Sequence, residues 1–229
     1  MAAGARAPAP AGYRLATYDQ RGHGASTPLG QAADYALEEF VADALDALDA
    51  LGWERAAVGG LSMGASVALR LALDHPGRVE RLLLAAPAFG WQPSAAVERF
   101  DELADGIEAL GVEGIVAGMR AAGPTRSPAS EQRIASWAAH ERASLVLALR
   151  TVGRWVALRD PAEPERLRVP AAVLAWPDDP MHPLELAQSC ARALGAPLGL
   201  LESAEQALAD PPAIGRLFSA LLDPSRAGP

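Results

Sequence analysis

The feature that most constrains this chain is a short turn in which a serine stands between two glycines, Gly60-Leu61-Ser62-Met63-Gly64. The residues before it, Ala56 to Gly59, form a short apolar run of strand length. After it, apolar residues recur at helical spacing from Met63 to Asp74. The pattern is G-x-S-x-G, and it predicts a strand, a sharp turn that exposes the Ser62 hydroxyl, and a helix.

An exposed serine on such a turn has two interpretations. It can be a nucleophile, with the Met63 amide at the start of the helix stabilising an oxyanion. It can also be an ordinary N-cap serine in a glycine-rich turn. The strand before the turn and the helix after it favour the nucleophile.

Short apolar runs alternate with amphipathic segments along much of the chain, which predicts a mostly parallel sheet flanked by helices. The expected strands are Tyr13 to Tyr18, Ala56 to Gly59, Leu82 to Ala86, Ala171 to Ala175 and Leu198 to Leu201. One helix is expected from about Asp34 until Gly52 stops it. Further helices are expected at Met63 to Asp74, Leu184 to Leu194 and Ala213 to Leu222.

The pattern changes between Pro87 and about Arg168, where helical segments follow one another without strand candidates. We therefore expect residues 1–87 and 169–229 to form an α/β core, with residues 88–168 inserted as a helical cap. Large aromatic side chains in this insertion either pack its own core, which we favour, or line an apolar pocket beneath it: Trp91, Phe100, Trp137 and Trp155.

Composition narrows the class of protein. The chain has 229 residues, half of them hydrophobic, a net charge of -8 and no run of basic residues, which argues against nucleic acid as a partner. No apolar run is long enough to cross a bilayer or to serve as a signal peptide, so we predict a cytoplasmic protein. Its single cysteine, Cys190, is expected to be buried and excludes an internal disulfide and a cysteine zinc site.

Upstream of the serine turn, Tyr18-Asp19-Gln20-Arg21-Gly22-His23-Gly24-Ala25-Ser26 resembles the D-x-R-G-x-G-x-S turn of the α/β-hydrolase superfamily. The order of segments outside the expected cap is similar to that family as well. The resemblance implies the α/β-hydrolase fold and a serine hydrolase of carboxylic esters or related small acyl substrates, with Ser62 as nucleophile and no cofactor or metal. It also implies that His23 is a loop residue.

The resemblance places the catalytic acid just after a late strand. The segment from Ala175 to Pro183 is similar to the family's G-x-x-D-x-x-x-P pattern, with Asp179 on the acid position and Trp176 in place of the glycine. The other interpretation of Asp179 is a turn aspartate before proline, and Asp178 is its substitute as the acid.

The base is the difficulty, because Gln206 stands where the family's histidine follows the last strand, and an amide cannot relay a proton. His182, three residues after Asp179, is either a relocated base or a loop histidine. His140, in a helical stretch of the cap, and His75, at a helix end, are weaker candidates. Two functions therefore stay open: a hydrolase that uses Ser62, Asp179 and His182, or an impaired relative that binds a small apolar ligand or a partner.

The resemblance also implies strands and an oxyanion loop that would precede Tyr13. Without them, either the strands at Tyr13 and Ala56 pair directly or the sequence is a shortened version of a longer protein. We favour a misplaced start, because Ala11 to Arg14 resembles the middle of such a protein.

Overall fold

The computed structural model describes residues 14–122, 128–209, 214–216 and 220. Its centre is a four-stranded parallel sheet in the order β1-β2-β3-β4. The strands are β1 (Ala56–Leu61), β2 (Val79–Ala85), β3 (Ala171–Ala175) and β4 (Leu198–Leu200). Since the strands are parallel, their carboxyl ends meet at one edge of the sheet, and the loops that follow β1 and β3 are neighbours there.

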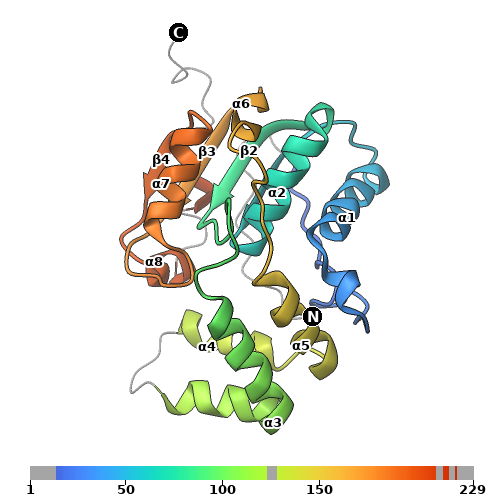
Figure 1. Ribbon diagram of the computed structural model, residues 1–229, viewed down its shortest axis with the longest axis vertical. Helices are drawn as coiled ribbons and strands as arrows, with labels where there is room; N and C mark the ends of the chain where they lie inside the picture. The colour runs from blue at the N-terminus through green and yellow to red at the C-terminus, as the bar shows by residue number, and fades with distance from the viewer. Residues whose placement is uncertain (1–13, 123–127, 210–213, 217–219, 221–229) are drawn as a thin grey trace.

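Helices join and cover these strands, as the apolar spacing predicts (Figure 1). A 3-10 turn at Ala32–Tyr35 and α1 (Leu37–Ala50) precede β1. Helix α2 (Met63–Asp74) and a 3-10 turn at Pro76–Arg78 join β1 to β2, α7 (Leu184–Ala193) joins β3 to β4, and α8 (Ala204–Ala209) follows β4. Helix α2 packs on β1, β2 and α1, and α7 packs on β3 and β4.

The core is built around α2 and the two central strands. Leu69 and Leu71 of α2, Leu82 and Leu84 of β2 and Val173 of β3 are all buried. Each such side chain contributes about 1.5 to 3 kcal/mol when it leaves water. This packing fixes the position of the turn that precedes α2.

Between β2 and β3 the chain forms consecutive helices. Figure 1 shows all but the last of them as a group beyond the end of the sheet toward which the β2 arrow points, and the last, short helix near the opposite end. They are α3 (Val97–Ala121, kinked at Gly111), α4 (Pro128–Trp137), α5 (Arg142–Val152) and the short α6 (Glu163–Arg166). A second apolar cluster joins α3, α4 and α5, with Phe100 and Trp137 packed against it. Trp155 instead enters the main core, where its ring meets Phe40 and Phe89.

The predicted strand at Tyr13 to Tyr18 is wrong. Tyr13 lies outside the described residues, and residues 14–18 have no regular structure, with Leu15 and Tyr18 exposed. A strand forms only where a neighbour completes its hydrogen bonds, and among the described residues β1 pairs with β2 alone. Direct pairing of these two segments is therefore excluded.

Several smaller expectations can be compared with the structure. His140 lies in the connection between α4 and α5 rather than within a helix, and His75 ends α2 in an exposed position. Most of the helix expected at Ala213 to Leu222 lies outside the described residues. Cys190 is buried, and burial raises the pKa of its thiol to about 11. None of the described helices is long and apolar enough to cross a membrane.

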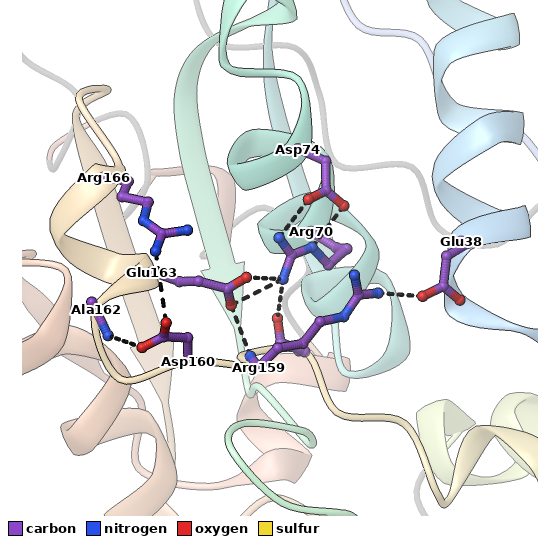
Figure 2. Close-up of polar contacts among 9 residues, drawn as sticks. Glu38, Arg70, Asp74, Arg159, Asp160, Ala162, Glu163 and Arg166 are labelled. Atoms are coloured by element: carbon purple, nitrogen blue, oxygen red, sulfur yellow. Dashed lines mark hydrogen bonds and ion pairs between the residues drawn. The ribbon is translucent and has the colours of Figure 1, made fainter.

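A buried charge network holds the far end of α2 (Figure 2). Arg70 is only 3% exposed, and its guanidinium donates to both oxygens of Glu163 at 2.9 and 3.0 Å and to Asp74 at 2.7 Å. Glu163 also accepts from the Arg159 amide at 2.7 Å. Because α6 carries Glu163, the network attaches the segment that leads into β3 to the helix that follows Ser62.

Substituting Arg70 with methionine should destabilise the protein by about 3 to 5 kcal/mol, because Glu163 would stay buried without its partner. Chemical denaturation measures the change in the free energy of unfolding. The double variant Arg70→Met/Glu163→Met should recover much of the loss. Arg154→Met, which removes an exposed pair with Asp101, serves as the control and should leave the midpoint close to wild type. Equal effects of Arg70→Met and Arg154→Met would contradict this account.

Candidate active site

Ser62 lies at the carboxyl end of β1 in a strained backbone conformation, with φ 56° and ψ −115°. A non-glycine residue reaches this region only when its surroundings impose it. Here the Ser62 amide donates to the Ala85 carbonyl at 2.9 Å, and α2 begins at the next residue. Ser62 stands at the N-cap position of α2, but its side chain makes no capping hydrogen bond to the helix, so the hydroxyl is not used as a cap.

The glycines of the motif let the chain make this turn. A Cβ on Gly60 would lie 2.1 Å from the carbonyl carbon of Gly64, which is far inside van der Waals contact. Gly60 therefore has to be a glycine if α2 is to start directly above the end of β1. The spacing of the motif is thus explained by a contact between two backbone segments.

The Ser62 hydroxyl is hydrogen-bonded to a histidine that arrives from the loop after β3. The Oγ atom lies 2.7 Å from His182 Nε2, and His182 Nδ1 lies 2.8 Å from Asp179 Oδ2. An ionised carboxylate only accepts, so Nδ1 carries the proton, Nε2 is the acceptor, and Ser62 donates to it. The side chains of His182 and Asp179 are 18% and 16% exposed, so the pair is shielded but open to a small molecule.

Asp179 is held by three donors. Its Oδ2 accepts from Trp176 Nε1 at 2.9 Å as well as from His182, and its Oδ1 accepts from the Met181 amide at 3.0 Å. Burial on its own would raise the pKa of Asp179, but the hydrogen bonds from Trp176, His182 and Met181 outweigh it, and the pKa lies below its ordinary value. The carboxylate therefore stays ionised and keeps His182 in the tautomer just described.

One donor follows Ser62 directly, and another approaches Gly64. The Met63 amide is in the first turn of α2, where backbone N–H groups have no partner within the helix. The Gln20 side chain comes from the turn before α1, and its Nε2 lies 3.9 Å from the point that a Cβ on Gly64 would occupy. The site therefore combines a hydroxyl, an imidazole, a carboxylate and N–H donors at one edge of a parallel sheet.

Comparison with known proteins agrees with the fold and with the family resemblance. A family described as "alpha/beta hydrolase fold" matches residues 3–110. A hydrolase from Pseudomonas aeruginosa superposes with a TM-score of 0.71 at 26% identity, over 90% of this chain and 78% of its own. The enol-lactonase of Burkholderia xenovorans superposes with a TM-score of 0.74 at 23% identity, over 90% and 79% of the two chains. The chain has the α/β-hydrolase fold, and residues 3–110 match the family that is named after it.

A curated relative matches a shorter stretch. A protein of Variovorax paradoxus named "Putative carbamate hydrolase RutD" is 43% identical over 74 residues, 32% of this chain. The match spans 27% of that relative, so about a quarter of its length is comparable. This chain is therefore similar to RutD in one segment and to the solved structures over most of its length.

The turn from Tyr18 to Ser26, which resembles a turn of the superfamily, has a structural role. Arg21 donates to the Asp43 carboxylate at 2.7 and 2.8 Å and to the Asp34 carbonyl at 2.9 Å, which ties the turn to α1. His23 donates through Nδ1 to the Arg21 carbonyl, and burial lowers its pKa. Its ring meets His140 edge to face at 5.1 Å, whereas the histidine hydrogen-bonded to the Ser62 hydroxyl is His182.

Gln206 is occupied elsewhere. Its side-chain Oε1 accepts from the Glu202 backbone amide at 2.8 Å, and its backbone amide donates to Ser203 Oγ at 3.2 Å. It therefore closes the local turn that starts α8. Asp178 has a left-handed backbone with φ 58°, which turns the chain so that Asp179, and not Asp178, meets His182.

Sequence reasoning noted Trp176 only as a replacement for glycine and did not assign it the contact with Asp179. The signal was the spacing, because an indole three residues before a carboxylate can reach back across a turn. Trp91, which we expected to pack the core of the insertion, follows the other interpretation and lines a pocket. It borders a cleft of about 310 Å³ between the loop after β2 and the start of α7, together with Gln92, Pro183, Glu185 and Leu186 among others. Pro183 directly follows His182, so one wall of this cleft adjoins the candidate site.

Gly60→Ala should destabilise the protein by about 2 kcal/mol or more, because the added methyl overlaps the Gly64 backbone. Thermal unfolding measures it. The control is Gly118→Ala in α3, where a Cβ meets nothing within 4 Å and alanine should stabilise the helix by about 1 kcal/mol. A Gly60→Ala protein as stable as wild type would mean that the turn tolerates a wider separation than described.

Proposed function

We propose that this protein is a serine hydrolase that cleaves carboxylic esters or closely related small acyl compounds. The single observation that carries the proposal is the continuous chain of hydrogen bonds from Ser62 Oγ through His182 to Asp179, at 2.7 and 2.8 Å. Both distances suit proton transfer, and the nucleophile, base and orienting acid are in the order that acyl transfer needs.

The reaction follows from these positions. Ser62 Oγ attacks the acyl carbon as His182 Nε2 takes its proton, and the Met63 amide stabilises the resulting oxyanion. The imidazolium, stabilised by Asp179, then returns the proton to the leaving alcohol, so that the ester bond breaks and an acyl group remains on Ser62. Water, deprotonated by His182, attacks this acyl-enzyme and releases the carboxylic acid and free Ser62.

Residues 88–168 concern how the substrate is held. We propose that they form a cap over the site, on three contacts between this insertion and the core. His140 meets His23, α4 packs against α8, and Tyr35 forms a hydrogen bond with Ser144 of α5. The cleft beside Pro183 would then hold part of the substrate next to the base.

The alternative, an impaired protein that binds a small apolar ligand or a partner, depended on Gln206 standing in for the base. It is not favoured, because His182 has the contact that a base needs and Gln206 closes a turn of its own. Carbamates and lactones are the substrates in the names of the RutD proteins and of the enol-lactonase, and both contain an acyl carbon like that of an ester. We include both with simple esters as substrates to be tested.

A fluorophosphonate probe should label the wild-type protein and leave Ser62→Ala unlabelled, because the probe reacts only with an activated serine hydroxyl. Hydrolysis of p-nitrophenyl acetate should fall about 10³-fold or more in the same variant. Ser66→Ala removes a buried hydroxyl of α2 and is the matched control, with wild-type labelling expected. Equal labelling of wild type and Ser62→Ala would refute the proposal.

His182→Ala should lower kcat for the same ester about 10³-fold or more, since Ser62 would lose its proton acceptor. Gln206→Ala should retain the wild-type kcat. Steady-state kinetics of the two variants, with thermal unfolding to confirm that both are folded, separates the two positions. If Gln206→Ala lost activity and His182→Ala retained it, His182 would not be the base and this part of the proposal would be wrong.

A further inference from the structure

Trp176 occupies a position that links the sheet to the candidate relay. It follows β3 directly and is only 4% exposed. Its ring packs in an apolar cluster with residues that end β2, follow β4 and belong to α8, namely Ala85, Ala86, Leu201 and Ala207. The indole is thus held by packing on several elements before it makes any polar contact.

The indole N–H is directed at the carboxylate that orients His182. Nε1 donates to Asp179 Oδ2 at 2.9 Å, and the same oxygen accepts from His182 Nδ1 at 2.8 Å. The Trp176 ring also meets the His182 ring nearly edge to face, with centroids 6.1 Å apart and planes 67° apart. One side chain therefore contacts both members of the acid–base pair.

Besides the hydrogen bond between Ser62 and His182, the loop that carries the pair is held by contacts within itself. Asp178 has a left-handed backbone, and the turn is closed by the His182 amide donating to the Asp179 carbonyl at 3.1 Å and by the Met181 amide donating to Asp179. These contacts join the loop to itself. The indole hydrogen bond is the polar contact that ties Asp179 to a residue packed in the cluster.

We propose that Trp176 is a positioning residue of the proposed hydrolase, and that its indole N–H holds Asp179 so that His182 presents Nε2 to Ser62. This inference rests on the proposed function. Trp176 does not reach the substrate in this scheme and acts only through Asp179 and His182. When a hydrogen bond to a charged group is removed, we expect the rate of a reaction that depends on it to fall about 10- to 100-fold.

The test is Trp176→Phe, which keeps an aromatic ring and removes the donor. We expect kcat for p-nitrophenyl acetate to fall about 10- to 100-fold while KM changes little, because substrate contacts remain. The pKa of Asp179 should rise, because its ionised form loses a donor. The ionisable group that faces Asp179 is His182, which is present in both proteins. Carbon NMR of isotope-labelled aspartate carboxyl groups measures the titration.

Trp155→Phe is the matched control. It also removes a buried indole hydrogen bond, from Nε1 to the Tyr35 carbonyl at 2.9 Å, but it lies in the main core. It should lower the unfolding temperature and leave both kcat and the Asp179 titration unchanged. Trp176→Phe with wild-type kcat and a wild-type Asp179 titration would overturn the inference, and so would equal effects of the two variants.

The titration is repeated in a Ser62→Ala background, where no turnover is needed. If the wild type hydrolyses no acyl substrate but Trp176→Phe still raises the Asp179 pKa, the proposed function fails and the role of the indole in holding Asp179 stands. If Trp176→Phe does not fold, the wild type provides the answer. Its Trp176 indole proton resonance should shift as Asp179 titrates while that of Trp155 does not, and a Trp176 resonance that ignores the titration would overturn the inference.

Discussion

The contact between the backbones of Gly60 and Gly64 is the constraint on which the site depends. It lets α2 start directly above the end of β1, and it places Ser62 in a conformation that turns its hydroxyl away from the helix. At its other end, α2 is held by the ion pair between Arg70 and Glu163. The helix is therefore fixed at both ends, and the strain at Ser62 is supported by packing along its whole length.

Much of this arrangement could be predicted from the sequence because it is local. The strand, turn and helix around Ser62 lie within about twenty residues, and periodicity together with two glycines specifies them. Met63 to Asp74 was predicted to the residue. Asp179 was singled out because the segment after the strand at Ala171 to Ala175 resembles the family's acid segment, and that resemblance too is local. The fold and the resemblance to the superfamily followed from the same motifs.

The features that the sequence did not show depend on contacts that hydrophobic periodicity does not reveal. The segment at Tyr13 to Tyr18 has the composition of a strand, but a strand also needs a neighbour, and none pairs with residues 14–18 in the described chain. His182 and Gln206 could not be separated by position alone, because the choice depends on the turn at Asp178 and on the hydrogen bond from the Glu202 amide. The contact of the Trp176 indole with Asp179 forms only when the loop after β3 brings the two side chains together.

The proposed acid and the proposed base come from one turn, with Asp179 and His182 three residues apart. Their separation is therefore set by local backbone geometry and does not rely on bringing together two loops that are far apart in the chain. In the proposed mechanism the region after β4 takes no part in proton transfer, so a change in its length would leave the contact between Asp179 and His182 intact. The same compactness means that a single short insertion between Trp176 and Pro183 would disable the acid and the base together.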